Sequence, residues 1–189
     1  AGGERSVDLR VEHFLEAMEL DPREFSEETL AEIEHAYAMT AVDIPPAPVE
    51  GAAETLTQLK SRGLRIGLIS NTGRTPGYAL REVLSAMGLA RSIDVMVFSN
   101  EHGFCKPQMS IFEELRRGLD VPYEEMMFVG DNPYADVHGA QRVGMKAVLF
   151  TPPVKGEAVA AHIEHGLEIV PDATITRLPD LLDVIERLS

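Results

Sequence analysis

Two aspartates in the segment VGDNPYAD, residues 129–136, have the residue type and the spacing to serve a divalent cation beside a phosphate group. Asp131 and Asp136 are five residues apart and follow the apolar run at residues 126–129. Mg²⁺ takes oxygen ligands and usually keeps several waters, so one or two protein carboxylates suffice. Asp131, at a predicted strand end, is the better direct ligand. Asp136, in the first turn of a predicted helix, either caps that helix or orients a metal-bound water or a lysine.

Two further polar clusters could complete a phosphate site. Ser70 ends the apolar run LRIGLIS, residues 64–70, and Asn71 follows it. A hydroxyl and free backbone N–H groups at a strand end can bind a phosphate oxygen. Lys106 precedes Pro107 at the approach to a predicted helix, where its ammonium could neutralise a phosphate or a carboxylate. Taken singly, a polar strand-end turn explains Ser70 and Asn71 better than a phosphate site does, and a solvated surface charge explains Lys106 better. Helix capping explains the two aspartates as well as a metal site does.

Short apolar runs alternate along the chain with segments that carry an apolar residue at every third or fourth position. The runs predict strands at residues 64–70, 93–99, 126–130, 146–150 and 173–175, and the periodic segments predict amphipathic helices. One of these helices is predicted to begin with a capping box of Ser110 and Glu113. The alternation indicates an α/β fold, a parallel sheet sandwiched by helices. Ligands bind at the carboxyl ends of such strands, which Ser70, the loop 100–106 and Asp131 each follow.

A proline-rich stretch divides the chain into two parts. Residues 1–48 are predicted to be helical, with an apolar stripe over residues 11–18 and Ser26 as the N-cap of a second helix. The sequence DIPPAPVEG, residues 43–51, contains three prolines and marks the boundary. Residues 49–189 then hold the parallel-sheet core.

The composition limits the classes of partner and compartment. The 189-residue chain is 44% apolar and 25% charged, with a formal net charge of −14. We therefore expect no binding to nucleic-acid backbones or anionic membranes, although a local basic pocket can still take a small anion. The single cysteine, Cys105, fits a reducing compartment. No apolar run approaches the roughly 18 residues of a membrane helix and no apolar signal region begins the sequence, so a cytoplasmic protein is expected.

The order of these motifs resembles the haloacid dehalogenase-like superfamily. A strand that ends in Ser-Asn, a Lys-Pro pair, FVGDNPYAD and GAQRVGMKAVLF occur in that order, and the resemblance covers roughly residues 45–188. It implies a Rossmann-like core with a small helical cap, which residues 1–48 would form. Most members are Mg²⁺-dependent phosphohydrolases, and some remove halide from 2-haloacids.

The resemblance also implies roles for the polar clusters. It assigns phosphate binding to Ser70 and Lys106, with Asn71 beside them. It assigns Mg²⁺, or another divalent cation, to Asp131 with support from Asp136, and makes Lys106 and Asp131 the catalytic residues. The implied activity is a phosphatase acting on a small phosphorylated substrate. A 2-haloacid dehalogenase fits less well, because its chemistry does not need the paired aspartates.

One motif of the family is missing from the sequence. Family members begin with an apolar strand ending in Asp-x-Asp-x-Thr, which supplies the nucleophile and the general acid/base. Asp8, in SVDLRV, lacks both the preceding apolar strand and the second aspartate. We therefore expect a sheet without its central strand, so that the strands ending at Ser70 and Asp131 leave a gap or pair directly. An exposed edge of this kind favours a homodimer through the incomplete sheet.

Three interpretations follow from that departure. The chain is a truncated phosphatase with a substitute nucleophile, which could be metal-bound water, another carboxylate or Cys105. Alternatively, it is a non-catalytic phosphate-binding or interaction module. In the third interpretation an N-terminal segment has been lost from the sequence or is supplied by another polypeptide. The intact set of Ser70, Lys106, Asp131 and Asp136 favours the first interpretation and leaves the nucleophile unknown.

Overall fold

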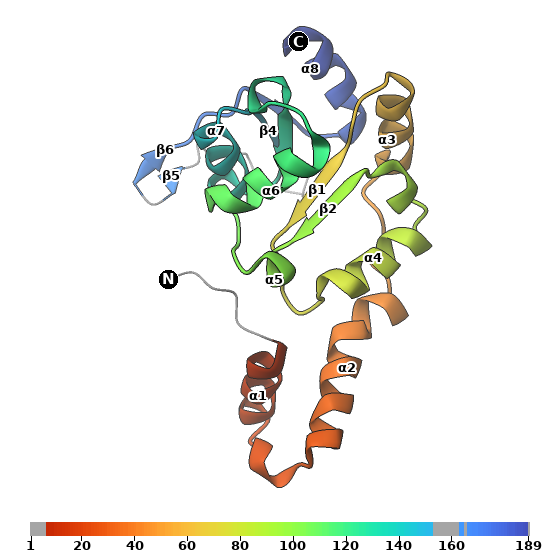
Figure 1. Ribbon diagram of the computed structural model, residues 1–189, viewed down its shortest axis with the longest axis vertical. Coiled ribbons are helices and arrows are strands. Elements are labelled where there is room, and N and C mark those ends of the chain that lie inside the picture. Colours follow the sequence, from red (N-terminus) through yellow and green to blue (C-terminus); the bar gives the residue numbers. More distant parts are fainter. Residues whose placement is uncertain (1–6, 153–162, 165, 189) are drawn as a thin grey trace.

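The computed structural model describes residues 7–152, 163–164 and 166–188. In these residues helices and strands alternate in an α/β structure (Figure 1). The α-helices are α1 (Val7–Ala17), α2 (Glu27–Asp43), α3 (Ala52–Ser61), α4 (Gly77–Ala86), α5 (Ser99–His102), α6 (Met109–Leu119), α7 (Gly139–Arg142) and α8 (Leu181–Leu188). Short 3-10 helices are η1 (Pro22–Glu24), η2 (Ala90–Ser92), η3 (Tyr123–Glu125) and η5 (Leu178–Asp180), and η4 (Pro133–His138) is a π-helix. The strands are β1 (Gly67–Ser70), β2 (Val95–Phe98), β3 (Met127–Gly130), β4 (Lys146–Phe150), β5 (Ile163–Glu164), β6 (Leu167–Glu168) and β7 (Ala173–Ile175). None of the helices in these described ranges is long and apolar enough to cross a membrane.

The parallel strands form two separate sheets. β1 pairs with β2, so that Ser70 lies opposite Phe98. In the second sheet the order is β3-β4-β7, and Gly130 lies opposite Leu149. Within the described chain β1 and β3 are not hydrogen-bonded to each other. The predicted parallel α/β fold is confirmed, whereas direct pairing of the strands that end at Ser70 and Gly130 is not seen among the described residues. A short antiparallel hairpin, β5-β6, was not predicted.

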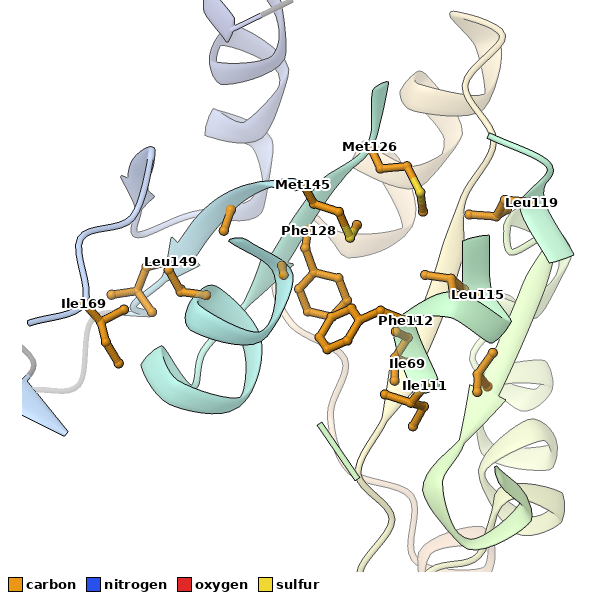
Figure 2. Packing of buried hydrophobic residues seen from close by; sticks show 14 residues of the cluster. Ile69, Ile111, Phe112, Leu115, Leu119, Met126, Phe128, Met145, Leu149 and Ile169 are labelled. Atoms are coloured by element: carbon orange, nitrogen blue, oxygen red, sulfur yellow. The ribbon is translucent and has the colours of Figure 1, made fainter. Parts of the chain in front are cut away.

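Two apolar clusters hold the core together. The larger one joins both parallel sheets to α6, and its members include Ile69 of β1, Phe112 of α6 and Phe128 of β3. Figure 2 shows the rings of Phe112 and Phe128 packed against each other at the centre of this cluster; their centroids are 5.4 Å apart. The smaller cluster packs α3 and α8 against β4 and β7. Because the larger cluster contacts both sheets, it fixes the relative position of β1 and β3 without hydrogen bonds between them.

The N-terminal helices form a hairpin beside the core. In Figure 1, α1 and α2 extend away from the sheets, and α2 approaches α4. The Thr29 N–H donates to the Ser26 hydroxyl at 3.1 Å, which confirms Ser26 as the N-cap of α2. Phe14 and Tyr37 pack across the hairpin with centroids 5.6 Å apart. The division into a cap-like part, residues 1–48, and a core, residues 49–189, stays a prediction, and residues 1–6 lie outside the described ones.

The predicted capping box at the start of α6 is wrong. Gln108 is the N-cap, and it makes no side-chain capping hydrogen bond. The Ser110 hydroxyl lies 3.0 Å from His102 Nε2, and the Glu113 carboxylate accepts from Arg116 Nε at 2.8 Å. This hydrogen bond is the main cause that lowers the pKa of Glu113 to about 2. A charged partner one turn away outcompetes a neutral backbone N–H for a carboxylate.

Truncation of Phe112 is expected to test whether the larger cluster holds the two sheets together. Phe112 is fully buried, and Phe112→Ala should lower the free energy of unfolding by about 3–5 kcal/mol, because it leaves a cavity where both sheets meet α6. Urea denaturation followed by circular dichroism measures this change. Phe104→Ala is the matched control, since Phe104 is 46% exposed, and it should change stability by less than about 0.5 kcal/mol. Equal effects of the two substitutions would contradict the packing described.

Candidate phosphate and metal site

The predicted site residues come from the carboxyl ends of strands in both sheets. Ser70 is the last residue of β1, and Asp131 directly follows Gly130, the last residue of β3. Lys106 lies in the loop between α5 and α6, which follows β2. In Figure 1, β1 and β2 both run toward α5, on the side of the core from which the α1–α2 hairpin extends. The fold thus brings residues from three separate parts of the sequence toward one edge, as expected for parallel strands.

The Lys106 ammonium is held by contacts to both sheets. Its Nζ lies 2.8 Å from Asp136 Oδ1 and donates to the main-chain oxygen of Ile69 at 2.9 Å. The same nitrogen lies 5.2 Å from the centroid of the Phe128 ring, at cation–π distance. The side chains of Lys106 and Asp136 are only 11% and 5% exposed. A pair this well buried is stabilised by its mutual attraction and its extra hydrogen bonds, and losing one partner leaves an uncompensated charge.

Asp136 has both carboxylate oxygens engaged by the protein. Oδ1 pairs with Lys106, and Oδ2 accepts from the Asn132 N–H at 2.9 Å. Asn132 is in turn the N-cap of η4, where its side chain accepts from the Ala135 N–H at 2.7 Å. Gly130 makes room for this arrangement, because a Cβ at that position would lie 2.6 Å from the Asp136 Cβ and closer still to its carboxylate. These contacts favour an orienting role for Asp136 toward Lys106 over direct coordination of a cation.

Asp131 differs from Asp136 in its surroundings. It is exposed at the end of β3, and no hydrogen bond or ion pair ties its carboxylate to the rest of the described chain. Among the described residues no group of three or more His, Cys, Asp and Glu side chains could hold a metal ion. A Mg²⁺ ion needs fewer protein ligands than that when water and phosphate oxygens fill its remaining positions. The free carboxylate of Asp131 therefore fits such an ion.

The polar residues after β1 have different partners. No hydrogen bond links the half-buried Ser70 hydroxyl to another described side chain. The Asn71 side chain, in contrast, contacts the main chain of Lys106. Sequence reasoning missed the buried hydroxyls of Thr72 and Ser99, which lie 3.0 Å apart and link the loop after β1 to the start of α5. The available signal for this link was a hydroxyl residue at or within two positions of the end of each apolar run.

A methyl group at Gly130 is expected to disturb the site through Asp136. Gly130→Ala should push the Asp136 carboxylate away from Lys106 and lower the free energy of unfolding by about 1–3 kcal/mol, the usual cost of overpacking. Denaturation curves with urea measure it. Gly73→Ala is the control in the neighbouring loop, because a Cβ there would meet no described atom within 4 Å. A Gly130→Ala protein as stable as the Gly73→Ala protein would rule out the close approach described.

Comparison with known proteins agrees with this architecture. The family model for haloacid dehalogenase-like hydrolases matches residues 3–144. The chain is 33% identical over 139 residues to the glyceraldehyde 3-phosphate phosphatase of Pyrococcus furiosus, covering 74% of this chain and 55% of that protein. It is 35% identical over 138 residues to the protein of the same name from Methanothermobacter thermautotrophicus, covering 71% and 58%. The crystal structure of a haloacid dehalogenase-type phosphatase from Thermococcus onnurineus superposes with a TM-score of 0.64 at 25% identity, covering 92% and 69%.

The chain spans a little over half the length of these two curated relatives. The match with the family model nevertheless covers most of its residues and includes β1, β2, β3 and the loop that carries Lys106. The chain belongs to the haloacid dehalogenase-like hydrolase family.

Proposed function

We propose that the protein is a phosphatase that hydrolyses the phosphomonoester of a small phosphorylated substrate. The observation that carries this proposal is the position of the Lys106 ammonium, which Asp136 and the Ile69 carbonyl hold near the strand ends that present Ser70 and Asp131. An ammonium and a free hydroxyl near the ends of parallel strands suit an anionic group with several oxygens. The names of the two curated relatives support phosphate esters as the substrate class.

The charges of the site favour a divalent cation. Lys106 carries one positive charge, and Asp131 and Asp136 carry two negative ones, so the three groups sum to −1. A phosphate dianion would be repelled by this sum, and a cation such as Mg²⁺ at Asp131 would reverse its sign. When bound, such an ion neutralises charge on the transferred phosphoryl group and lowers the pKa of water. Asp131 would hold this ion, and Asp136 would keep Lys106 oriented.

The protein's own groups have separate tasks in this proposal. The Ser70 hydroxyl and the Lys106 ammonium donate hydrogen bonds to phosphate oxygens and stabilise the charge that moves onto them during transfer. The nucleophile remains open between water, a carboxylate and the half-buried thiol of Cys105. A carboxylate could also come from a strand that fills the gap between β1 and β3. Substitution of Cys105 by serine and of nearby carboxylates by amides, one at a time, identifies the attacking group.

A second candidate is a phosphate-binding module without catalysis. It is favoured by the sequence, in which no Asp-x-Asp-x-Thr motif supplies the nucleophile of the family. Such a module would use Ser70 and Lys106 to bind phosphate and would release it unchanged. Binding of inorganic phosphate without turnover of any phosphomonoester is the result that this candidate predicts.

An assay with p-nitrophenyl phosphate is expected to separate these functions. The wild-type protein should hydrolyse it with Mg²⁺ and lose activity in EDTA. Asp131→Asn should lower kcat/KM by about 100-fold or more, because it removes the carboxylate that would hold the cation. Replacing p-nitrophenyl phosphate by 2-chloropropionate tests the dehalogenase alternative in the same buffer.

The control for this assay is a conservative change of an aspartate away from the site. Asp120→Asn suits this purpose, because Asp120 is an exposed C-cap of α6 with φ of 52°, a conformation that Asn tolerates well. Its activity should equal that of the wild type. Absence of phosphatase activity under every condition, or equal activity of wild type and Asp131→Asn, would contradict a cation-dependent phosphatase.

Among the described residues β1 pairs only with β2 and β3 only with β4, which leads to a further expectation, a homodimer that covers the other edges of β1 and β3. Light scattering at micromolar concentration should then give twice the mass of one chain. Leu68→Lys should shift the protein toward monomer, because it places a charge on β1, where Leu68 is only half-buried. A monodisperse wild-type monomer would exclude the dimer and leave the phosphatase proposal intact.

A further inference from the structure

The carboxamide of Asn71 forms a matched pair of hydrogen bonds with the main chain of Lys106. The Lys106 N–H donates to Asn71 Oδ1 at 2.7 Å, and Asn71 Nδ2 donates to the Lys106 carbonyl at 3.0 Å. The two residues are 35 positions apart in the sequence. An amide side chain that meets both polar groups of one residue imitates the pairing between neighbouring strands. It therefore fixes the main chain of Lys106 relative to the end of β1.

The main chain around Asn71 is itself held by buried hydroxyl groups. The Thr72 N–H donates to the Ser99 hydroxyl at 2.7 Å, and the hydroxyls of Thr72 and Ser99 lie 3.0 Å apart. Both side chains are buried, with exposures of 4% and 0%. The Asn100 N–H also donates to the Thr72 hydroxyl at 3.1 Å. Because these bonds join the loop after β1 to the helix α5, the Asn71 carboxamide is presented to Lys106 by a fixed support.

The opposite end of Lys106 meets the same strand. Its Nζ donates to the carbonyl of Ile69, two residues before Asn71, and pairs with Asp136. A lysine side chain has about four rotatable bonds, and ordering it costs up to about 2 kcal/mol of rotamer entropy. Fixing both the main chain and the ammonium removes that freedom before a ligand arrives. Preorganisation of this kind is what makes a hydrogen-bond donor effective toward a developing charge.

We propose that Asn71 is a positioning residue that sets the place of the Lys106 ammonium, instead of contacting phosphate through its side chain. This assignment rests on the proposed function of Lys106 in phosphate binding. The side-chain oxygen of Asn71 accepts from the Lys106 N–H, and one N–H of its amide donates to the Lys106 carbonyl. An aspartate here would lose the donor, and a glutamine would place the amide one methylene too far along. Only a carboxamide on a one-carbon stem satisfies both main-chain groups.

The experiment compares Asn71→Ala with wild type in two measurements on the whole chain. Calorimetric titration with inorganic phosphate and Mg²⁺ gives the affinity for phosphate. This affinity should weaken about tenfold in the variant, because the two hydrogen bonds that position Lys106, the donor to phosphate, are lost. Acetylation by acetic anhydride, followed by mass spectrometry, gives the reactivity of each lysine. Lys106 should react about tenfold faster in the variant, because its main chain, and with it the position of its side chain, is no longer fixed.

Lys60 is the internal control in the labelling measurement. Its ammonium is also paired, with both Asp94 oxygens at 2.7 Å, and it lies on α3 with no contact to Asn71. Its acetylation rate should stay the same in Asn71→Ala. A rise at Lys60 equal to that at Lys106 would mean general loosening of the fold and would overturn the positioning role.

The remaining outcomes separate this inference from the proposed function. Weaker phosphate binding with unchanged Lys106 reactivity would make Asn71 a direct phosphate ligand and overturn its positioning role. Absence of phosphate binding by the wild type would reject the proposed function. In that case the Lys106 labelling rate still decides whether Asn71 holds this lysine, since an unchanged rate contradicts the inference and a selective rise supports it.

Discussion

The buried ion pair between Lys106 and Asp136 is the interaction on which the rest of the site depends. It connects the loop that follows β2 to the start of η4, and through the Ile69 carbonyl it also reaches β1. Two charges so poorly exposed to water are stable only with close geometry and additional hydrogen bonds. The Asn132 N–H donates such a bond to the Asp136 carboxylate, for which Gly130 leaves room, and the Ile69 carbonyl accepts one from the Lys106 ammonium. The Lys106 ammonium therefore connects β1 with the segment that follows β3, although these two strands share no backbone hydrogen bonds.

This arrangement gives the two aspartates of VGDNPYAD different chemistry. Asp136 is buried, and both of its carboxylate oxygens contact protein groups. Asp131 is exposed, and its carboxylate has no hydrogen bond or ion pair within the described residues. Five residues and one π-helical turn are enough to separate these environments. One aspartate is thus suited to orienting a lysine and the other to meeting a cation from solvent. The spacing of the pair alone could not distinguish the two roles.

Much of the fold could be predicted from the sequence, because each parallel strand is a short apolar run between amphipathic helices. The ends of the strands were predicted less accurately than their existence. β1 begins at Gly67 instead of residue 64, and Ser99 already belongs to α5. The hairpin β5-β6 has two residues per strand, too few to produce an alternating pattern. The link between Asn71 and Lys106 was beyond sequence reasoning, because a side chain that pairs with a distant main chain leaves no periodic signal. The matched residues show that the chain belongs to the haloacid dehalogenase-like family. The same residues do not identify the substrate.

A crystal structure of the protein with Mg²⁺ and orthovanadate would show whether Lys106, Ser70 and Asp131 bind a phosphoryl group and its cation. Vanadate adopts the geometry of a phosphoryl group in transfer, so it reports where such a group is stabilised. The account predicts an oxyanion within hydrogen-bond distance of Lys106 Nζ and the Ser70 hydroxyl, with a cation on the Asp131 carboxylate. Vanadate bound elsewhere on the molecule, with no oxyanion within hydrogen-bond distance of Lys106 Nζ and no cation at Asp131, would contradict it.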